Sequence, residues 1–134
     1  MPSNFNTIQK HAHASDGNST DQGDLTAARK GGHGHSSATH GYMSGGYNEN
    51  IIDKWLFATG ANATDVGNLL GNHGSGSGTS SSTHGYVGGI GYINTTQSFS
   101  EVIQKFSFTS DGNSTDVANL YLARGVGSAN APQV

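Results

Sequence analysis

The amino-acid sequence predicts an all-β fold in which one supersecondary unit is repeated along the chain. Three passages begin with Ile-x-Lys, at residues 8–10, 52–54 and 103–105, and reach a leucine at the same offset. Two copies of Thr-His-Gly-Tyr, at 39–42 and 83–86, each lead to a Gly-Gly pair. Successive Ile-x-Lys passages begin 44 and 51 residues apart. Units of this length bury their hydrophobic faces only against neighbouring units, so we expect them to stack.

The strongest strand patterns lie directly at the start of the second and third copies. Residues 51–59 are rich in Ile, Trp and Phe, and residues 102–109 alternate two phenylalanines with Ser and Thr. The first copy has His11 and His13 at the two phenylalanine positions. Its inward face is therefore expected to be wetter, as in a terminal unit or an interface.

Each predicted strand is followed by residues that are typical of a turn. Asp-Gly-Asn-Ser-Thr-Asp occupies 16–21 and 111–116, where Gly permits positive φ and the short polar side chains bond to the backbone. A short strand through Val66 or Val117 to the leucine is expected next. A loop rich in Gly and Ser follows, and the Thr-His-Gly-Tyr segment is expected to form an inner strand, where backbones approach closely.

The pattern divides the chain into an N-terminal arm (1–7), repeat 1 (8–50), repeat 2 (51–101) and a truncated repeat 3 (102–134). This corresponds to about two to two-and-a-half propeller blades, which cannot close a ring. Leu, Ile, Val and Phe make up only 23 of the 134 residues, so the core is thin. We therefore expect the fold to be completed by oligomerisation.

The motifs of the repeat occur in a fixed order along the chain. Residues 25–29 read Leu-Thr-Ala-Ala-Arg and residues 120–124 repeat the pattern, whereas the middle copy has His73 at the arginine position. An aromatic segment ending in Gly-Gly, 40–46, is followed by the predicted strand that contains Asp53. This order resembles that of kelch repeats, and the resemblance implies kelch-type β-propeller blades, present here as a partial β-propeller. Stacking of the same repeats into a linear solenoid stays open as an alternative.

The repeated phrases are also similar to propeller-like repeats of phage virion and appendage proteins. That similarity implies a non-enzymatic structural or assembly protein of a virion or extracellular appendage. Its expected partners are further copies of itself or other structural proteins. The serines lack a nucleophile-elbow context and the acidic residues recur in turns, so no enzyme is expected.

Composition narrows the classes of partner. The net charge is −3 with only six Lys and Arg, none clustered, so nucleic acid is not an expected partner. No segment approaches the roughly 20 apolar residues of a membrane span. No charged-then-apolar leader is present at the start, so synthesis in the cytoplasm without a signal peptide is expected.

The repeated turns place oxygen atoms at alternate positions, as calcium loops do. No glutamate follows at a suitable distance, and the middle copy replaces the leading Asp with Gly60, so structural turns are the favoured interpretation. Calcium stays the alternative, and no other cofactor is expected. The candidate ligands are Asp16, Asn18, Asp21, Asp111, Asn113 and Asp116.

The second function that the sequence permits is a lectin-like carbohydrate-binding module, in which aromatic faces contact sugar rings. The recurring His-Gly-Tyr phrase and the single Trp supply the candidate ligand-binding residues: His40, Tyr42, His84, Tyr86 and Trp55. Two further histidine pairs, His11-x-His13 and His33-x-His35, have spacing that suits a metal ion. Neither pair recurs in the other copies, so a solvated or interface role is favoured for them.

Overall fold

The structure, a computed structural model, describes residues 4–89, 92–93, 96–97 and 99–124. Within these residues the fold is all-β, with twelve strands and no helix. The strands are β1 (Phe5–Lys10), β2 (Thr20–Arg29), β3 (His33–Ser36), β4 (His40–Gly46), β5 (Glu49–Leu56), β6 (Thr64–Asn68), β7 (Ser77–Ser80), β8 (His84–Gly88), β9 (Tyr92–Ile93), β10 (Thr96–Gln97), β11 (Ser100–Ser107) and β12 (Thr115–Arg124).

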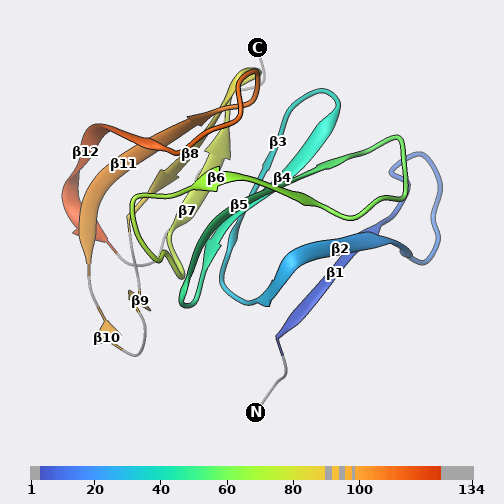
Figure 1. Cartoon of the computed structure of the whole chain (residues 1–134), viewed down its shortest axis with the longest axis horizontal. Coiled ribbons are helices and arrows are strands. Elements are labelled where there is room, and N and C mark those ends of the chain that lie inside the picture. The colour runs from blue at the N-terminus through green and yellow to red at the C-terminus, as the bar shows by residue number, and fades with distance from the viewer. Residues whose placement is uncertain (1–3, 90–91, 94–95, 98, 125–134) are drawn as a thin grey trace.

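The strands form antiparallel sheets that follow one another along the chain. We call the β1–β2 pair unit 1, the four-stranded sheet β3-β4-β5-β6 unit 2, and the four-stranded sheet β7-β8-β11-β12 unit 3. The β9–β10 ladder is inserted between β8 and β11 and accounts for the longer spacing before the third sequence copy. The units lie side by side in chain order, from the blue pair to the orange sheet (Figure 1).

The strand registers repeat together with the sequence. Ile8 is paired with Gly23, Ile52 with Gly67, and Ile103 with Ala118. In all three ladders the register shifts directly after this isoleucine, which marks a β-bulge at the same place in each copy. The three copies thus share the position of the bulge, although Gly23 and Gly67 have positive φ there and Ala118 does not.

Most of the predicted elements are confirmed, and one is wrong. β5 and β11 occupy the two segments with the strongest strand pattern, and β4 and β8 begin at the two His-Gly-Tyr phrases. The segment after each leucine, expected to be a Gly/Ser-rich loop, instead contains β3 and β7. The short strand expected through Val117 is the ten-residue β12.

The strands β3 and β7 form because small side chains allow units 2 and 3 to approach closely. A Cβ atom at Gly78 would lie 2.9 Å from both Cβ of His33 and Cε1 of His35. These strands have little intrinsic β-propensity, so the pairing with β4 and β8 and the packing between the sheets must hold them.

The predicted division of the chain stays a prediction. Its boundary between residues 50 and 51 falls inside β5, so the sheets are offset from the sequence repeats by about half a unit. Residues 1–3 of the predicted arm and residues 125–134 of the predicted third repeat lie outside the described residues.

Each junction between units has its own hydrophobic cluster. The cluster between units 1 and 2 consists of Ile8, Leu25 and Ala63, with Met43 and Trp55 packed against it. The cluster between units 2 and 3 contains residues at the same repeat positions together with two further aromatic rings. Its members are Tyr42, Ile52, Leu69, Val87, Phe106 and Phe108.

Glycine is required where a turn of one unit contacts the last strand of the unit before it. Gly23 has φ +140°, and a Cβ there would lie 2.6 Å from the carbonyl oxygen of Ala61. We expect Gly23→Ala to lower the free energy of unfolding by about 3 kcal/mol, from backbone strain and overlap. Gly71→Ala is the matched control, since a Cβ at Gly71 meets nothing within 4 Å. Urea denaturation of both variants measures the difference, and equal losses would contradict this account.

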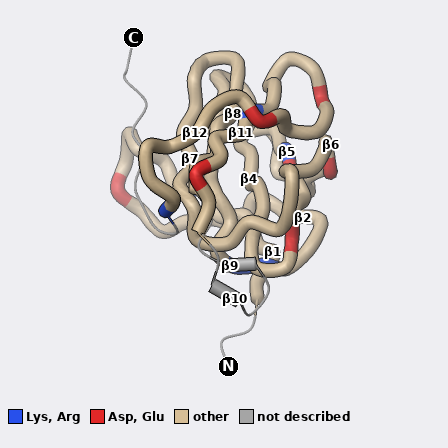
Figure 2. Tube along the Cα trace, turned by 90° about the vertical axis from the view of Figure 1, so that its left-hand side faces the viewer, with Lys and Arg blue, Asp and Glu red and all other residues tan. Residues whose placement is uncertain are grey.

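Charged residues do not gather on one surface. Lys and Arg positions and Asp and Glu positions are both spread over the trace in the view of Figure 2. In the described part of the chain there is no helix that could cross a membrane.

Candidate assembly interface

The repeated turns that end in Asn, Gly-Ala-Asn at 60–62 and Asp-Gly-Asn at 111–113, are the elements that join one unit to the next. At the first junction, Oδ1 of Asn62 accepts a hydrogen bond from the backbone N–H of Asp24 (3.0 Å), and the Ala63 N–H donates to the Asp24 carbonyl (2.8 Å). At the second junction, Oδ1 of Asn113 accepts from the Asn68 N–H (2.9 Å), and the Ser114 N–H donates to the Asn68 carbonyl (2.9 Å). The two junctions are therefore joined by the same pair of bonds.

A buried ion pair lies beneath the first of these turns. Nη2 of Arg29, at the end of β2, is 2.9 Å from Oδ2 of Asp53 on β5, and the two side chains are 1% and 0% exposed. The carboxylate also accepts hydrogen bonds from the backbone N–H and the hydroxyl of Thr26. Burial lowers the pKa of Arg29, while Asp53 opposes that shift. Removing either partner would leave a charge buried without its counter-charge.

The second junction has a neutral pair at the same position. His73 takes the place of Arg29, and Gln104 takes the place of Asp53. The Gln104 amide donates to Nε2 of His73 (2.7 Å), and its Oε1 accepts from the Leu70 N–H (2.9 Å) and the Ser114 hydroxyl (2.6 Å). Burial lowers the pKa of His73 to about 4, so its ring is neutral at pH 7 and can accept this bond.

A second histidine site lies between β3 and β7. Nδ1 of His35 donates to the Thr79 carbonyl (3.0 Å), and its Nε2 accepts from the hydroxyl of Ser44 (2.8 Å). Burial lowers the pKa of His35 to about 4, and burial also lowers the pKa of His33. The predicted His33-x-His35 pair therefore takes the interface role, whereas His11 and His13 are exposed.

The predicted ligand-binding residues do not all come together. Tyr42 is 1% exposed, its ring stacks on that of Phe108 at 4.4 Å between centroids, and so it offers no face to a sugar. The ring of Trp55 covers Gly41 on the paired strand. His40 and Trp55 line a hollow of about 240 Å³ that also contains Lys54 and Asp111.

The recurring histidines bond to the residue that precedes them. Nδ1 of His40 is 2.8 Å from the hydroxyl of Thr39, and Nδ1 of His84 is 2.9 Å from the hydroxyl of Thr83. His84 and Tyr86 are half-buried in unit 3 and do not line the hollow of His40. A ligand role for these residues stays a prediction.

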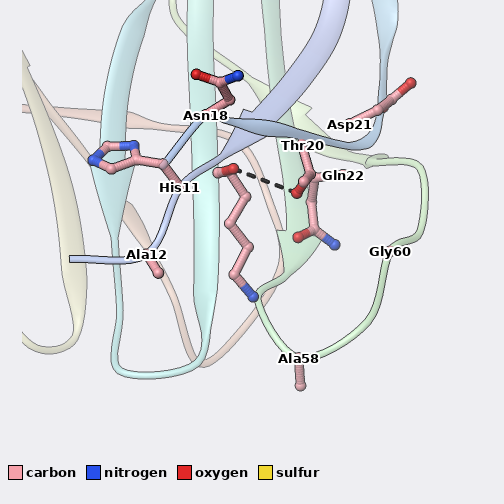
Figure 3. Close-up of a pocket in the computed structure, with 9 residues that line it drawn as sticks. His11, Ala12, Asn18, Thr20, Asp21, Gln22, Ala58 and Gly60 are labelled. Carbon is pink, nitrogen blue, oxygen red and sulfur yellow. Dashed lines mark hydrogen bonds between the residues drawn. The ribbon is translucent and has the colours of Figure 1, made fainter. Parts of the chain in front are cut away.

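The predicted calcium ligands have separate hydrogen-bonding roles. Oδ1 of Asp21 accepts from the Gly23 N–H (2.9 Å), Asp111 is paired with Lys54 (3.0 Å), and Asn113 belongs to the second junction. Asn18 and Asp21 line one hollow of about 440 Å³, but their side chains point away from each other (Figure 3). Asp16 and Asp116 are exposed.

Metal binding is not supported by a compact set of ligands. Among the described residues, no three His, Cys, Asp or Glu side chains are placed to hold a metal ion. The calcium interpretation of the repeated turns stays a prediction.

Sequence reasoning located Asp53 and the position shared by Arg29 and His73, but it missed the pairing across the junctions. Asp53 and Gln104 are the middle residue of Ile-x-Lys, a position that varies between copies. The available signal is paired variation, because Arg29 occurs with Asp53 and His73 occurs with Gln104. Residues that change together in this way contact each other across a repeat junction.

Comparison with known proteins found no family model that matches this sequence and no matching relative among curated proteins. Function is therefore inferred from the residues of the two junctions. These residues join one unit to the next through Nη2 of Arg29 and Nε2 of His73.

Proposed function

We propose that this chain is a non-enzymatic structural protein whose kelch-like units form a partial β-propeller of about two to two-and-a-half blades. Association with further units completes the fold, and a virion or extracellular appendage is the proposed location. The single observation that carries the proposal is the construction of the two junctions. Both use the same turn-to-strand hydrogen bonds and bury a polar pair at the same position.

The buried polar residues support an assembly role. Arg29, Asp53, His73 and Gln104 are all buried, and each is hydrogen-bonded to its partner across a junction between units. A repeat protein of this kind gains stability from each neighbour that covers an exposed unit face. Units added at either end would therefore stabilise the chain.

The proposal predicts self-association of the purified protein. We expect light scattering to give a mass above that of one chain, rising with concentration, and class averages of the same peak to show rings or ordered arrays. A monomer at every concentration that unfolds cooperatively would contradict the proposal. Filaments would favour linear stacking over a closed propeller.

A carbohydrate-binding role is the second candidate, because His40 and Trp55 line an open hollow next to a lysine and an aspartate. Aromatic and polar groups of this kind can bind a sugar ring. Binding of the assembled protein on a glycan array would favour this alternative. Assembly without any glycan binding would favour the structural role alone.

A further inference from the structure

Within the described residues, unit 1 carries a surface that matches one side of a junction and faces no other unit. We call this surface the head; it consists of Gln9, Asn18 and Ser19, all exposed. The Ser19 hydroxyl donates to Oε1 of Gln9 (3.0 Å), as the Ser114 hydroxyl does to Oε1 of Gln104 at the second junction (2.6 Å). Gln104 is 0% exposed there. The head therefore resembles the side of a junction that supplies the turn, whose Asn side chain accepts a hydrogen bond from the last strand of the unit before it.

The last strand of unit 3 carries the opposite half of a junction. We call this surface the tail; it consists of Asn119, Tyr121 and Arg124 on β12, at the repeat positions of Asp24, Thr26 and Arg29. Arg124 is exposed, whereas Arg29 is 6% exposed.

The tail is also apolar, and it lies far from the head. Tyr121 is 96% exposed, and its neighbours Leu122 and Val117 on β12 are 58% and 44% exposed. Exposed apolar side chains that lie next to one another, rather than singly, are typical of surfaces that a partner covers. Head and tail lie at opposite ends of the row of units (Figure 1), so one chain cannot join them to each other.

We propose that the head of one molecule binds the tail of a second molecule in the geometry of the internal junctions. The Arg124 guanidinium then donates to Oε1 of Gln9, and Oδ1 of Asn18 accepts from the Asn119 N–H. The proposal rests on the assembly function proposed above and names the partner as a second copy of this chain. Contacts of this head-to-tail type form a ring if the rotation closes and a filament if it does not.

Two sequence differences between the repeat copies make the head-to-tail contact weaker than the internal junctions. Ala118 takes the place of Gly23 and Gly67, where a Cβ would overlap the carbonyl group of the docking turn. Arg124 meets a neutral amide in Gln9, whereas Arg29 meets the carboxylate of Asp53. The association between molecules is therefore reversible and depends on protein concentration, whereas the internal junctions, which lie within one chain, do not depend on it.

Cross-linking between two single-cysteine variants tests the contact directly, because the chain contains no cysteine. An equimolar mixture of Asn18→Cys and Asn119→Cys is treated with a short bismaleimide. We expect a cross-linked dimer from this mixture and none from Asn18→Cys with the exposed Ser82→Cys. The double variant Asn68→Cys/Asn113→Cys calibrates the reaction, since these two residues are hydrogen-bonded at the second junction.

A second experiment uses two variants that should change how strongly the head binds the tail. We expect Ala118→Gly to lower the dissociation constant about tenfold, by relieving the overlap with the turn of the second molecule. Arg124→Ala is expected to raise it, and both residues are exposed in the single chain. Assembly without the 18–119 cross-link, or unchanged by Ala118→Gly, would overturn the head-to-tail contact and leave the structural role standing. If every variant, including Ala118→Gly, stays monomeric, both the head-to-tail contact and the structural role are overturned.

Discussion

Acidification should destabilise this protein by several kcal/mol between about pH 7 and pH 4, with buried histidines as the cause. His35 and His73 are 6% and 2% exposed, and burial lowers the pKa of each ring to about 4, from an ordinary value of 6.5. A difference of this size is worth about 3 kcal/mol for each ring.

The direction of the effect follows from which state binds the proton first. As the pH falls through 6.5, the unfolded chain takes up protons on these histidines, whereas the folded protein keeps both rings neutral. The unfolded state therefore binds more protons, and stability falls as the pH falls. The loss is complete below about pH 4, where the folded rings also become protonated. Above about pH 7 the two histidines cause no further change.

Urea denaturation across this pH range measures the effect, and two variants assign it. His73→Gln removes one buried titrating ring and keeps an amide that can bond to Gln104, so we expect the pH dependence to shrink by the share of that ring, about 3 kcal/mol. His11→Gln, an exposed histidine, is the matched control and should reproduce the wild-type curve. An unchanged curve for His73→Gln would show that other groups cause the acid sensitivity.

Exchanging the polar pair of one junction for that of the other should have the second large effect. Asp53→Gln alone leaves the buried guanidinium of Arg29 without a counter-charge, at an expected cost of about 3–5 kcal/mol. Arg29→His alone leaves the carboxylate of Asp53 similarly unpaired. The double variant Arg29→His/Asp53→Gln recreates the His73–Gln104 pair of the second junction, and we expect it to recover most of the loss.

Equilibrium unfolding of the four proteins gives a double-mutant cycle, which isolates the energy of the pair. The coupling should be at least about 2 kcal/mol, because each single change disrupts the same buried contact. Single changes that simply add in the double variant would contradict the equivalence of the two junctions. Thr109→Ala, at an exposed turn, controls for general effects of substitution.

The sequence predicts the repeated parts of the fold well, for physical reasons. β11 is visible because Phe106 and Phe108 alternate with polar residues, and both phenylalanines are buried. β3 and β7 could not be predicted, because Gly and Ser carry no pattern of alternation and these strands depend on contacts between units. Tyr42 was a plausible ligand contact, since an aromatic residue in a repeated phrase can equally serve a pocket or a core.

The polar pairs at the junctions could not be predicted from the sequence, for a different reason. The partners Arg29 and Asp53 are 24 residues apart and belong to different units, so local patterns cannot pair them. Only the comparison of copies within the chain relates them to His73 and Gln104.

The separation of the core into two clusters has a consequence for how the chain opens. Unit 1 has two strands and is held by the smaller cluster, whereas units 2 and 3 share the larger, more aromatic one. In the described part of the chain each unit packs mainly against its neighbours, so fraying can begin at one end without disrupting the rest. Backbone amides of β1 and β2 would then exchange with solvent deuterium sooner than those of β4 and β5. A second molecule bound at the head would slow that exchange and make the end of the chain as protected as its middle.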